Sequence, residues 1–275
     1  MPSHWSLVLF TLLVQSAVGS VWCVQVALFL SGGRFGISHL ELQVLTTLCL
    51  VVVGLVVAMA HLGRPGASFH AIRNFKRSWL SREVLAVHFF AGVLAILAVL
   101  AGISPGASNG WLMLMVSLPG GAVLYVMTRV YHLRTVPSWN HAGTPLNFLG
   151  TALLLGGLQF ILVLNTLTVV PSVSHDALGA EIFRIVPFIA ILVGFMLKVL
   201  AAGVNPSGKM NSAGLFKTSQ PVMQGCGTAL CAISMLCCGS TGFQSTLLYL
   251  AAVSLIIGEI IHRVRFYNTY HRIGL

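Results

Sequence analysis

Long apolar runs, separated by short polar segments, follow one another along almost the whole chain. They fall approximately at 6–30, 40–60, 84–102, 111–130, 146–169, 182–201, 222–239 and 243–262. A helix needs about 20 mostly apolar residues to cross a lipid bilayer, and most of these runs reach that length. The run at 222–239 is the weakest. The pattern predicts an all-α, polytopic integral membrane protein, a helical bundle with eight transmembrane helices.

Helix-breaking residues lie between the runs and support this division. Pro105 and Gly106 separate the third and fourth runs, for example, and Pro206 follows the sixth. Because no long polar segment interrupts the pattern, we expect a single integral membrane domain over residues 1–275. The stretch 7–18 loosely resembles a signal peptide. No Lys or Arg precedes it and the hydrophobicity continues to Leu30, which favours an uncleaved first helix.

The composition agrees with the membrane prediction and excludes a soluble domain. Hydrophobic residues make up 57% of the chain and charged residues only 7%, whereas soluble domains carry roughly a quarter charged residues. The six cysteines form no C-x-x-C motif and lie mostly inside apolar runs. They indicate core packing, and not a disulfide framework or an iron-sulfur site.

The formal net charge of +10 is distributed between the apolar runs and does not form one patch, which argues against a nucleic-acid partner. Of the 15 basic residues, all except Arg34 and Arg184 lie near the even-numbered connections or in the C-terminal segment. Cytoplasmic loops of membrane proteins carry an excess of Lys and Arg. We therefore expect both termini and the even-numbered connections in the cytoplasm.

Titratable side chains at the ends of the runs are the candidates for chemistry, because such groups are costly at membrane depth. They lie beside the even-numbered connections and thus meet one membrane face: His61, Glu83, Arg129, Tyr131, His132, Glu259, His262 and Arg263. Oxidation of a quinol at this face would release two protons with two electrons. His61 suits the first proton and a partly buried Glu83 the second.

Each of these side chains also has a structural interpretation. His61 suits the C-terminal end of a helix dipole, and Glu83 the N-terminal end of the next helix, after a capping serine and the interfacial Trp79. Glu259 and Arg263, spaced i,i+4, predict an ion pair on one helix. His88 lies deeper, where it is either a haem ligand or a hydrogen-bonded core histidine. These alternatives stay open at this point.

Four groups of residues together resemble one protein family. They are 61–65 (HLGRP), 78–83 (SWLSRE), the segment 129–145 with Arg129, Tyr131, Trp139 and Pro145, and 258–267 with Glu259 and Arg263. In order and spacing the sequence is similar to the DmsC family, the membrane anchor subunit of dimethyl sulfoxide reductase. The similarity extends over nearly its whole length.

The resemblance implies a menaquinol-oxidising anchor in the bacterial inner membrane, with no haem and no iron-sulfur cluster of its own. It implies a heterotrimer with an iron-sulfur electron-transfer subunit and a molybdopterin catalytic subunit, so no activity is expected from the isolated chain. His61 and Glu83 then belong to the quinol site. Other members of the pocket or docking surface are Arg64, Pro65, Ser81, Arg82, Arg129 and Tyr131.

Two other functions remain compatible with buried His and Glu side chains. A secondary transporter would place them near the middle of the membrane, on interrupted helices in repeated halves. A diheme cytochrome b would need paired histidines at matching depth on facing helices. Neither a pair of interrupted runs nor a matching partner for His88 is evident in the sequence.

Overall fold

The computed structural model describes residues 5–32, 37–61, 74–103, 110–133, 135–168, 177–204, 219–236 and 241–268, and apart from turns these ranges are helical. The helices are α1 (Trp5–Leu30), α2 (Ile37–His61), α4 (Trp79–Ile103), α5 (Gly110–Tyr131), α6 (Gly143–Thr168), α7 (Ala177–Gly203), α9 (Ser219–Leu236) and α10 (Thr241–Asn268). All except α9 are long and apolar enough to cross a membrane. The prediction of a polytopic helical membrane protein is confirmed.

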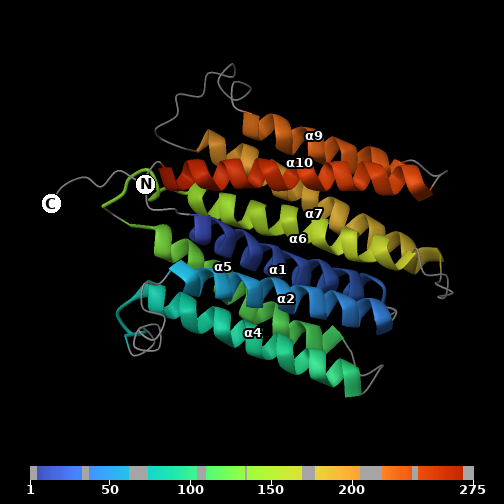
Figure 1. Cartoon of the computed structure of the whole chain (residues 1–275), viewed down its shortest axis with the longest axis horizontal. Helices are drawn as coiled ribbons and strands as arrows, with labels where there is room; N and C mark the ends of the chain where they lie inside the picture. Colours follow the sequence, from blue (N-terminus) through green and yellow to red (C-terminus); the bar gives the residue numbers. More distant parts are fainter. Residues whose placement is uncertain are drawn as a thin grey trace.

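Helix α9 corresponds to the weakest apolar run. Its 18 residues rise about 27 Å, slightly less than the ~30 Å hydrocarbon core of a bilayer. Figure 1 shows it beside α10, against which it packs along its length. The expected segment 237–239 lies outside the described residues. The assignment of α9 as an eighth membrane span stays a prediction.

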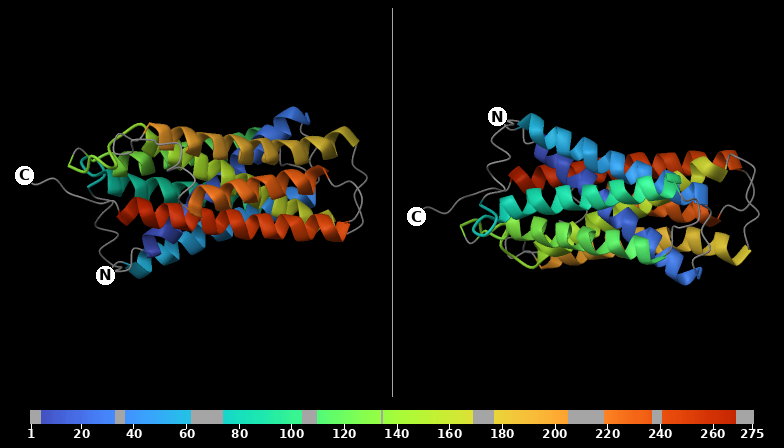
Figure 2. Two further views of the ribbon diagram at one scale, coloured as in Figure 1. Left: turned by 90° about the horizontal axis from the view of Figure 1, so that it is seen from above. Right: turned by 90° about the horizontal axis from the view of Figure 1, so that it is seen from below.

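Consecutive helices run in alternating directions along the long axis of the bundle (Figures 1 and 2). The beginnings of α1, α4, α6 and α9 therefore share one end with the C-terminal ends of α2, α5, α7 and α10. The described lysines and arginines lie at or near this end, apart from Arg184; we call it the basic end. The predicted grouping of the even-numbered connections is thus confirmed, while their side of the membrane stays a prediction.

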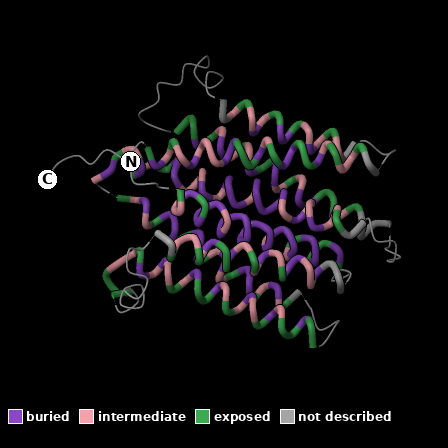
Figure 3. The backbone as a smooth tube through the Cα atoms, in the orientation of Figure 1, coloured by how far each residue is buried: buried purple, intermediate pink, exposed green. Residues whose placement is uncertain are grey.

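Helix α1 is at the centre of the bundle, where it packs against α2, α5, α6, α7 and α10. Figure 3 shows buried residues concentrated on α1 and α6, whereas the outer helices expose one side. Phe89, Ile96 and Leu118 are each more than 60% exposed on those outer helices. Apolar outer faces suit lipid, and helices satisfy their own backbone hydrogen bonds there.

Glycines permit the close approach of α1, α6 and α7. A Cβ atom added to Gly19 would lie 1.7 Å from the carbonyl oxygen of Ala152, and one added to Gly156 would lie 2.3 Å from the carbonyl carbon of Gly19. Gly150 and Gly194 meet in the same way between α6 and α7. The small residues let the helix backbones touch, which is how membrane helices associate without a hydrophobic driving force.

The cysteine prediction is correct for only part of the described sequence. Cys23 and Cys231 are buried, as expected of packing residues, whereas Cys49 and Cys226 are exposed. Cys237 and Cys238 lie outside the described residues.

The crossing of α1 and α6 yields a direct test. Gly156→Ala should lower the thermal stability of the purified protein, because the new methyl group forces the two backbones apart at a cost of about 1–3 kcal/mol. Gly92→Ala on α4 is the matched control, since nothing lies within 4 Å of its added Cβ. Equal melting temperatures for the two variants would contradict the tight crossing.

Candidate functional site

The structure brings part of the predicted site together at the basic end. Glu83 and Ser81, in the first turns of α4, are buried, and Tyr131 is the buried last residue of α5. His61 is the last residue of α2, but its side chain lies outside what the structure describes, as do Arg64 and Pro65. The helix that carries His61 therefore ends at the same end of the bundle as Glu83.

The start of α4 is fixed by local hydrogen bonds. The Ser78 hydroxyl accepts a 3.3 Å bond from the backbone N–H of Ser81, so the predicted capping serine is confirmed. The Arg82 side chain donates to the carbonyl oxygens of Phe75 and Lys76 at 2.8 and 2.9 Å. These bonds attach the preceding turn to the helix and set the position of Glu83.

Two of the predicted pocket residues stack on an aromatic ring. The guanidinium carbon of Arg82 lies 4.2 Å from the centre of the Trp79 ring, and that of Arg129 lies 5.0 Å from it. This cation–π arrangement links α4 to α5. Arg129 is exposed, so its charge faces the surroundings of the bundle at this end.

Glu83 is a buried carboxylate with one unpartnered oxygen. Its side chain is 3% exposed, and its Oε1 atom has no hydrogen-bond partner among the described residues. It is close enough to the phenols of Tyr131 and Tyr267 to interact with them electrostatically. A buried carboxyl oxygen without a partner is costly, which makes it a natural acceptor for a ligand hydroxyl or a proton.

Tyr131 belongs to a hydrogen-bonded tyrosine pair that the sequence reasoning did not find. Its hydroxyl lies 2.9 Å from that of Tyr267 on α10, and Tyr267 in turn donates to Thr11 on α1 at 3.5 Å. Trp139 stacks on Phe266 and donates to its carbonyl oxygen at 2.9 Å. The α5–α6 connection is thereby held against the end of α10.

A second buried polar group lies between α6, α7, α9 and α10. Glu259 forms an ion pair with Lys198, its Oε1 lying 2.9 Å from Nζ, and accepts hydrogen bonds from Thr151 at 2.9 Å and Gln224 at 2.6 Å. Glu259 and Lys198 are 0% and 4% exposed. Three donors from three helices thus neutralise or solvate one carboxylate.

The predicted ion pair between Glu259 and Arg263 is wrong. Arg263 donates to Gln15 at 2.5 Å and to Thr151 at 3.3 Å, and its guanidinium carbon lies 4.3 Å from the centre of the Phe148 ring. The i,i+4 spacing allowed the pair, but Lys198 reaches Glu259 from α7. Lys198 had counted toward a basic connection in the sequence, whereas it is buried within α7.

His88 is not a core residue. It is exposed on α4, and its Nδ1 lies 2.7 Å from the carbonyl oxygen of Val84 in the same helix. Its expected hydrogen bond is present, but its expected place in the core is wrong. Within the described ranges, no three His, Cys, Asp or Glu residues are grouped closely enough to hold a metal ion.

His141 organises the start of α6. Its Nδ1 accepts from the backbone N–H of Gly143 at 3.0 Å, and its Nε2 lies 2.9 Å from the carbonyl oxygen of Ser138. Partial burial lowers the pKa of His141 below its ordinary value of 6.5, and the neighbouring His132 lowers it further. The neutral imidazole is the form that makes both bonds.

Comparison with known proteins identifies relatives over the full length. A family model described as DMSO reductase anchor subunit (DmsC) matches residues 1–269. The C subunit of the anaerobic dimethyl sulfoxide reductase of Haemophilus influenzae is 27% identical, over 98% of this sequence and 95% of its own. The YnfH subunit of an Escherichia coli anaerobic dimethyl sulfoxide reductase is 25% identical, over 99% and 96%.

The buried ion pair predicts a large stability effect. Lys198→Met should destabilise the protein by about 3–5 kcal/mol, because it leaves the Glu259 carboxylate buried without its cation. Adding Glu259→Gln should restore most of the loss. Lys76→Met, an exposed lysine at the same end, is the control for loss of charge alone. Thermal unfolding of the four proteins in detergent measures these effects, and equal stabilities would contradict the pairing.

The His141 bonds predict loss of stability in acid. Since the folded protein holds His141 neutral, the unfolded protein binds its proton more readily, and the stabilisation present above pH 6.5 is lost as the pH falls below that value. Melting temperatures measured from about pH 8 to about pH 5 should fall less steeply in His141→Gln than in the unmodified protein. Identical slopes would show that His141 does not contribute.

Proposed function

The chain belongs to the DMSO reductase anchor subunit (DmsC) family, and on this premise we propose that it oxidises menaquinol at the basic end of the bundle. The electrons pass to an iron-sulfur subunit and from there to a molybdopterin catalytic subunit, the three subunits forming a heterotrimer. In this arrangement the protein is the membrane anchor of an anaerobic respiratory reductase in the bacterial inner membrane. It carries neither haem nor an iron-sulfur cluster itself.

The observation that carries the proposal is the buried Glu83 carboxylate with its unpartnered Oε1 atom. It lies at the end of the bundle where α2 terminates in His61. A carboxylate that lacks a protein donor can accept a hydrogen bond from the hydroxyl of a bound quinol. It can then take the proton of that hydroxyl as the electrons leave.

The reaction requires two proton acceptors. Oxidation of the quinol breaks two O–H bonds and yields the quinone, two protons and two electrons. His61 accepts one proton, as an imidazole does near neutral pH, and Glu83 accepts or relays the other. The Tyr131–Tyr267 pair is close enough to Glu83 for electrostatic interaction, and its hydroxyl groups are bonded to each other and to Thr11.

The remaining predicted residues support the pocket from its edge. Ser81 is buried two residues before Glu83 in the first turns of α4, so it shapes the pocket around that carboxylate. Arg82 and Arg129, held on Trp79, give the rim a positive charge. We assign Arg64 and Pro65, which lie between α2 and α4 in the sequence, to the same rim, where the iron-sulfur subunit docks.

The orientation follows from the basic end. We propose that this end, with both termini, faces the cytoplasm, because cytoplasmic loops carry an excess of Lys and Arg. The proposal is supported by the antiparallel order of the helices, since α1 begins and α10 finishes at the basic end (Figure 1).

Substitution of the two proton acceptors tests the function. Glu83→Gln and His61→Arg should each lower menaquinol-dependent reduction of dimethyl sulfoxide by the complex about 100-fold or more, the usual contribution of an acid–base group. Activity with an artificial electron donor that bypasses the membrane subunit should stay unchanged. Glu181→Gln, an exposed carboxylate near the opposite end of the bundle, is the control.

Comparing activity with menaquinol and with the artificial electron donor distinguishes a loss of quinol oxidation from a loss of complex assembly. A parallel fall with both donors would mean that the complex fails to assemble, which would assign Glu83 a structural role. Full menaquinol activity in both variants would refute the site.

A further inference from the structure

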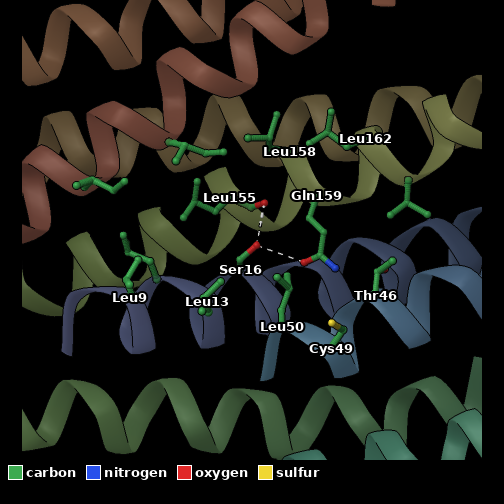
Figure 4. Close-up of a pocket in the computed structure, with 14 residues that line it drawn as sticks. Leu9, Leu13, Ser16, Thr46, Cys49, Leu50, Leu155, Leu158, Gln159 and Leu162 are labelled. Carbon is green, nitrogen blue, oxygen red and sulfur yellow. Dashed lines mark hydrogen bonds between the residues drawn. The ribbon is translucent and has the colours of Figure 1, made fainter. Parts of the chain in front are cut away.

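A lateral cavity lies between α1, α2, α6 and α10 (Figure 4), and Glu83 is not among the residues that line it. Its volume is about 480 Å³, within the range of ligand-sized pockets. Leucine side chains make up much of the lining: Leu9, Leu12, Leu13, Leu50, Leu155, Leu158 and Leu162. The exposure of Leu9, Cys49 and Ile256 indicates that the cavity opens onto the side of the bundle.

The polar groups of the cavity already satisfy one another. Ser16 donates to the carbonyl oxygen of Leu155 at 3.2 Å and lies 3.3 Å from Gln159 Oε1, and Gln159 donates to Thr47 at 3.0 Å (Figure 4). The hydroxyl of Thr46 is bonded to its own helix. The walls therefore offer hydrocarbon and paired polar groups, which favours an occupant that has no hydrogen-bonding groups of its own.

We propose that this cavity binds the isoprenoid tail of the quinol whose ring is oxidised at the basic end; the inference rests on the proposed function. A branched hydrocarbon tail fits leucine-lined walls, where its apolar surface packs against apolar side chains. The occupant gains contacts on four helices at once.

The cavity is lined in part by α1 and α2, the two helices that extend from it toward the proposed site of the quinol ring. Along α2, the 12 residues from Cys49 to His61 rise about 18 Å, a distance that a tail of several isoprene units spans. On α1, Leu12 follows Thr11, the residue that binds Tyr267 of the tyrosine pair. A quinol with its ring near Glu83 can thus lay its tail toward the middle of the bundle and out through the lateral opening.

Filling the cavity should affect only donors that have a tail. In the assembled complex, Leu13→Trp and Leu162→Trp should raise KM for a menaquinol with an isoprenoid side chain about tenfold, the effect of losing roughly two buried methylene groups. The KM for an analogue without a side chain should stay unchanged, as should kcat for both donors. Leu192→Trp, on the outer surface of α7 and outside the cavity lining, is the control.

The outcomes distinguish this inference from the function on which it rests. If the unmodified complex oxidises both quinols and the cavity variants affect both equally or neither, the tail site is wrong and the function stands. If the unmodified complex oxidises neither quinol, the proposed function itself fails.

A second measurement uses the unmodified complex and does not depend on the variants folding. A naphthoquinone with a photoreactive group at the far end of its isoprenoid tail should label the cavity residues of α1, α2 and α6. Excess menaquinol should prevent the labelling. Labelling of these residues by a photoreactive phospholipid that menaquinol does not displace would assign the cavity to a lipid acyl group and overturn the proposal.

Discussion

The buried ion pair and hydrogen bonds of Glu259 are the interactions that hold the helices of the bundle together across α6, α7, α9 and α10. Its carboxylate is fully buried, and it receives Lys198 from α7, Thr151 from α6 and Gln224 from α9. Lipid offers no alternative partner to any of these groups, so separating the helices would leave several polar atoms unsatisfied together. One acidic residue on the last helix thereby fixes three other helices around it. Apolar packing, including the glycine contacts of α1 with α6, then determines how closely the backbones approach.

Helix α10 connects the buried Glu259 to the site at the basic end, because it also carries Arg263 and Tyr267. Arg263, one turn after Glu259, is held by Gln15 and Thr151 and lies over the Phe148 ring. The next turn presents Tyr267 to Tyr131. Arg263 and Gln15 bond to each other, but Arg263 Nε and Nη1 and Gln15 Nε2 have no further partner among the described residues, and Glu83 on α4 also retains an unpartnered oxygen. Among the described buried side-chain atoms that lack a hydrogen-bond partner, Glu83 Oε1 is the one that belongs to a carboxylate, and a carboxylate oxygen can accept a proton.

The sequence predicted the architecture because apolar length and charge alternation are properties of single segments. It identified Glu83 for the same reason, since a carboxylate at the start of an apolar run is evident without knowledge of neighbouring helices. The partner of Glu259 was not predictable in this way: local spacing favoured Arg263, and only tertiary packing brings Lys198 to it. The direction in which His88 points depends on helix rotation, which the evenly apolar α4 does not specify. Gln15 was overlooked, although a polar residue within an apolar run gave a signal, and Tyr267, part of the 258–267 motif, was given no role.

The hydrogen bond between Gln15 and Arg263 joins residues 248 positions apart in the sequence. Proteins are synthesised from the N-terminus, so the central helix α1 enters the membrane long before α10 exists. During that interval the amide of Gln15 has no guanidinium to bind, and α1 must be retained in the bilayer by its apolar side chains alone. Completion of the bundle thus coincides with completion of synthesis. A product truncated before α10 would lack the Arg263 donor and would leave Gln15 Oε1 without this partner at the centre of the bundle.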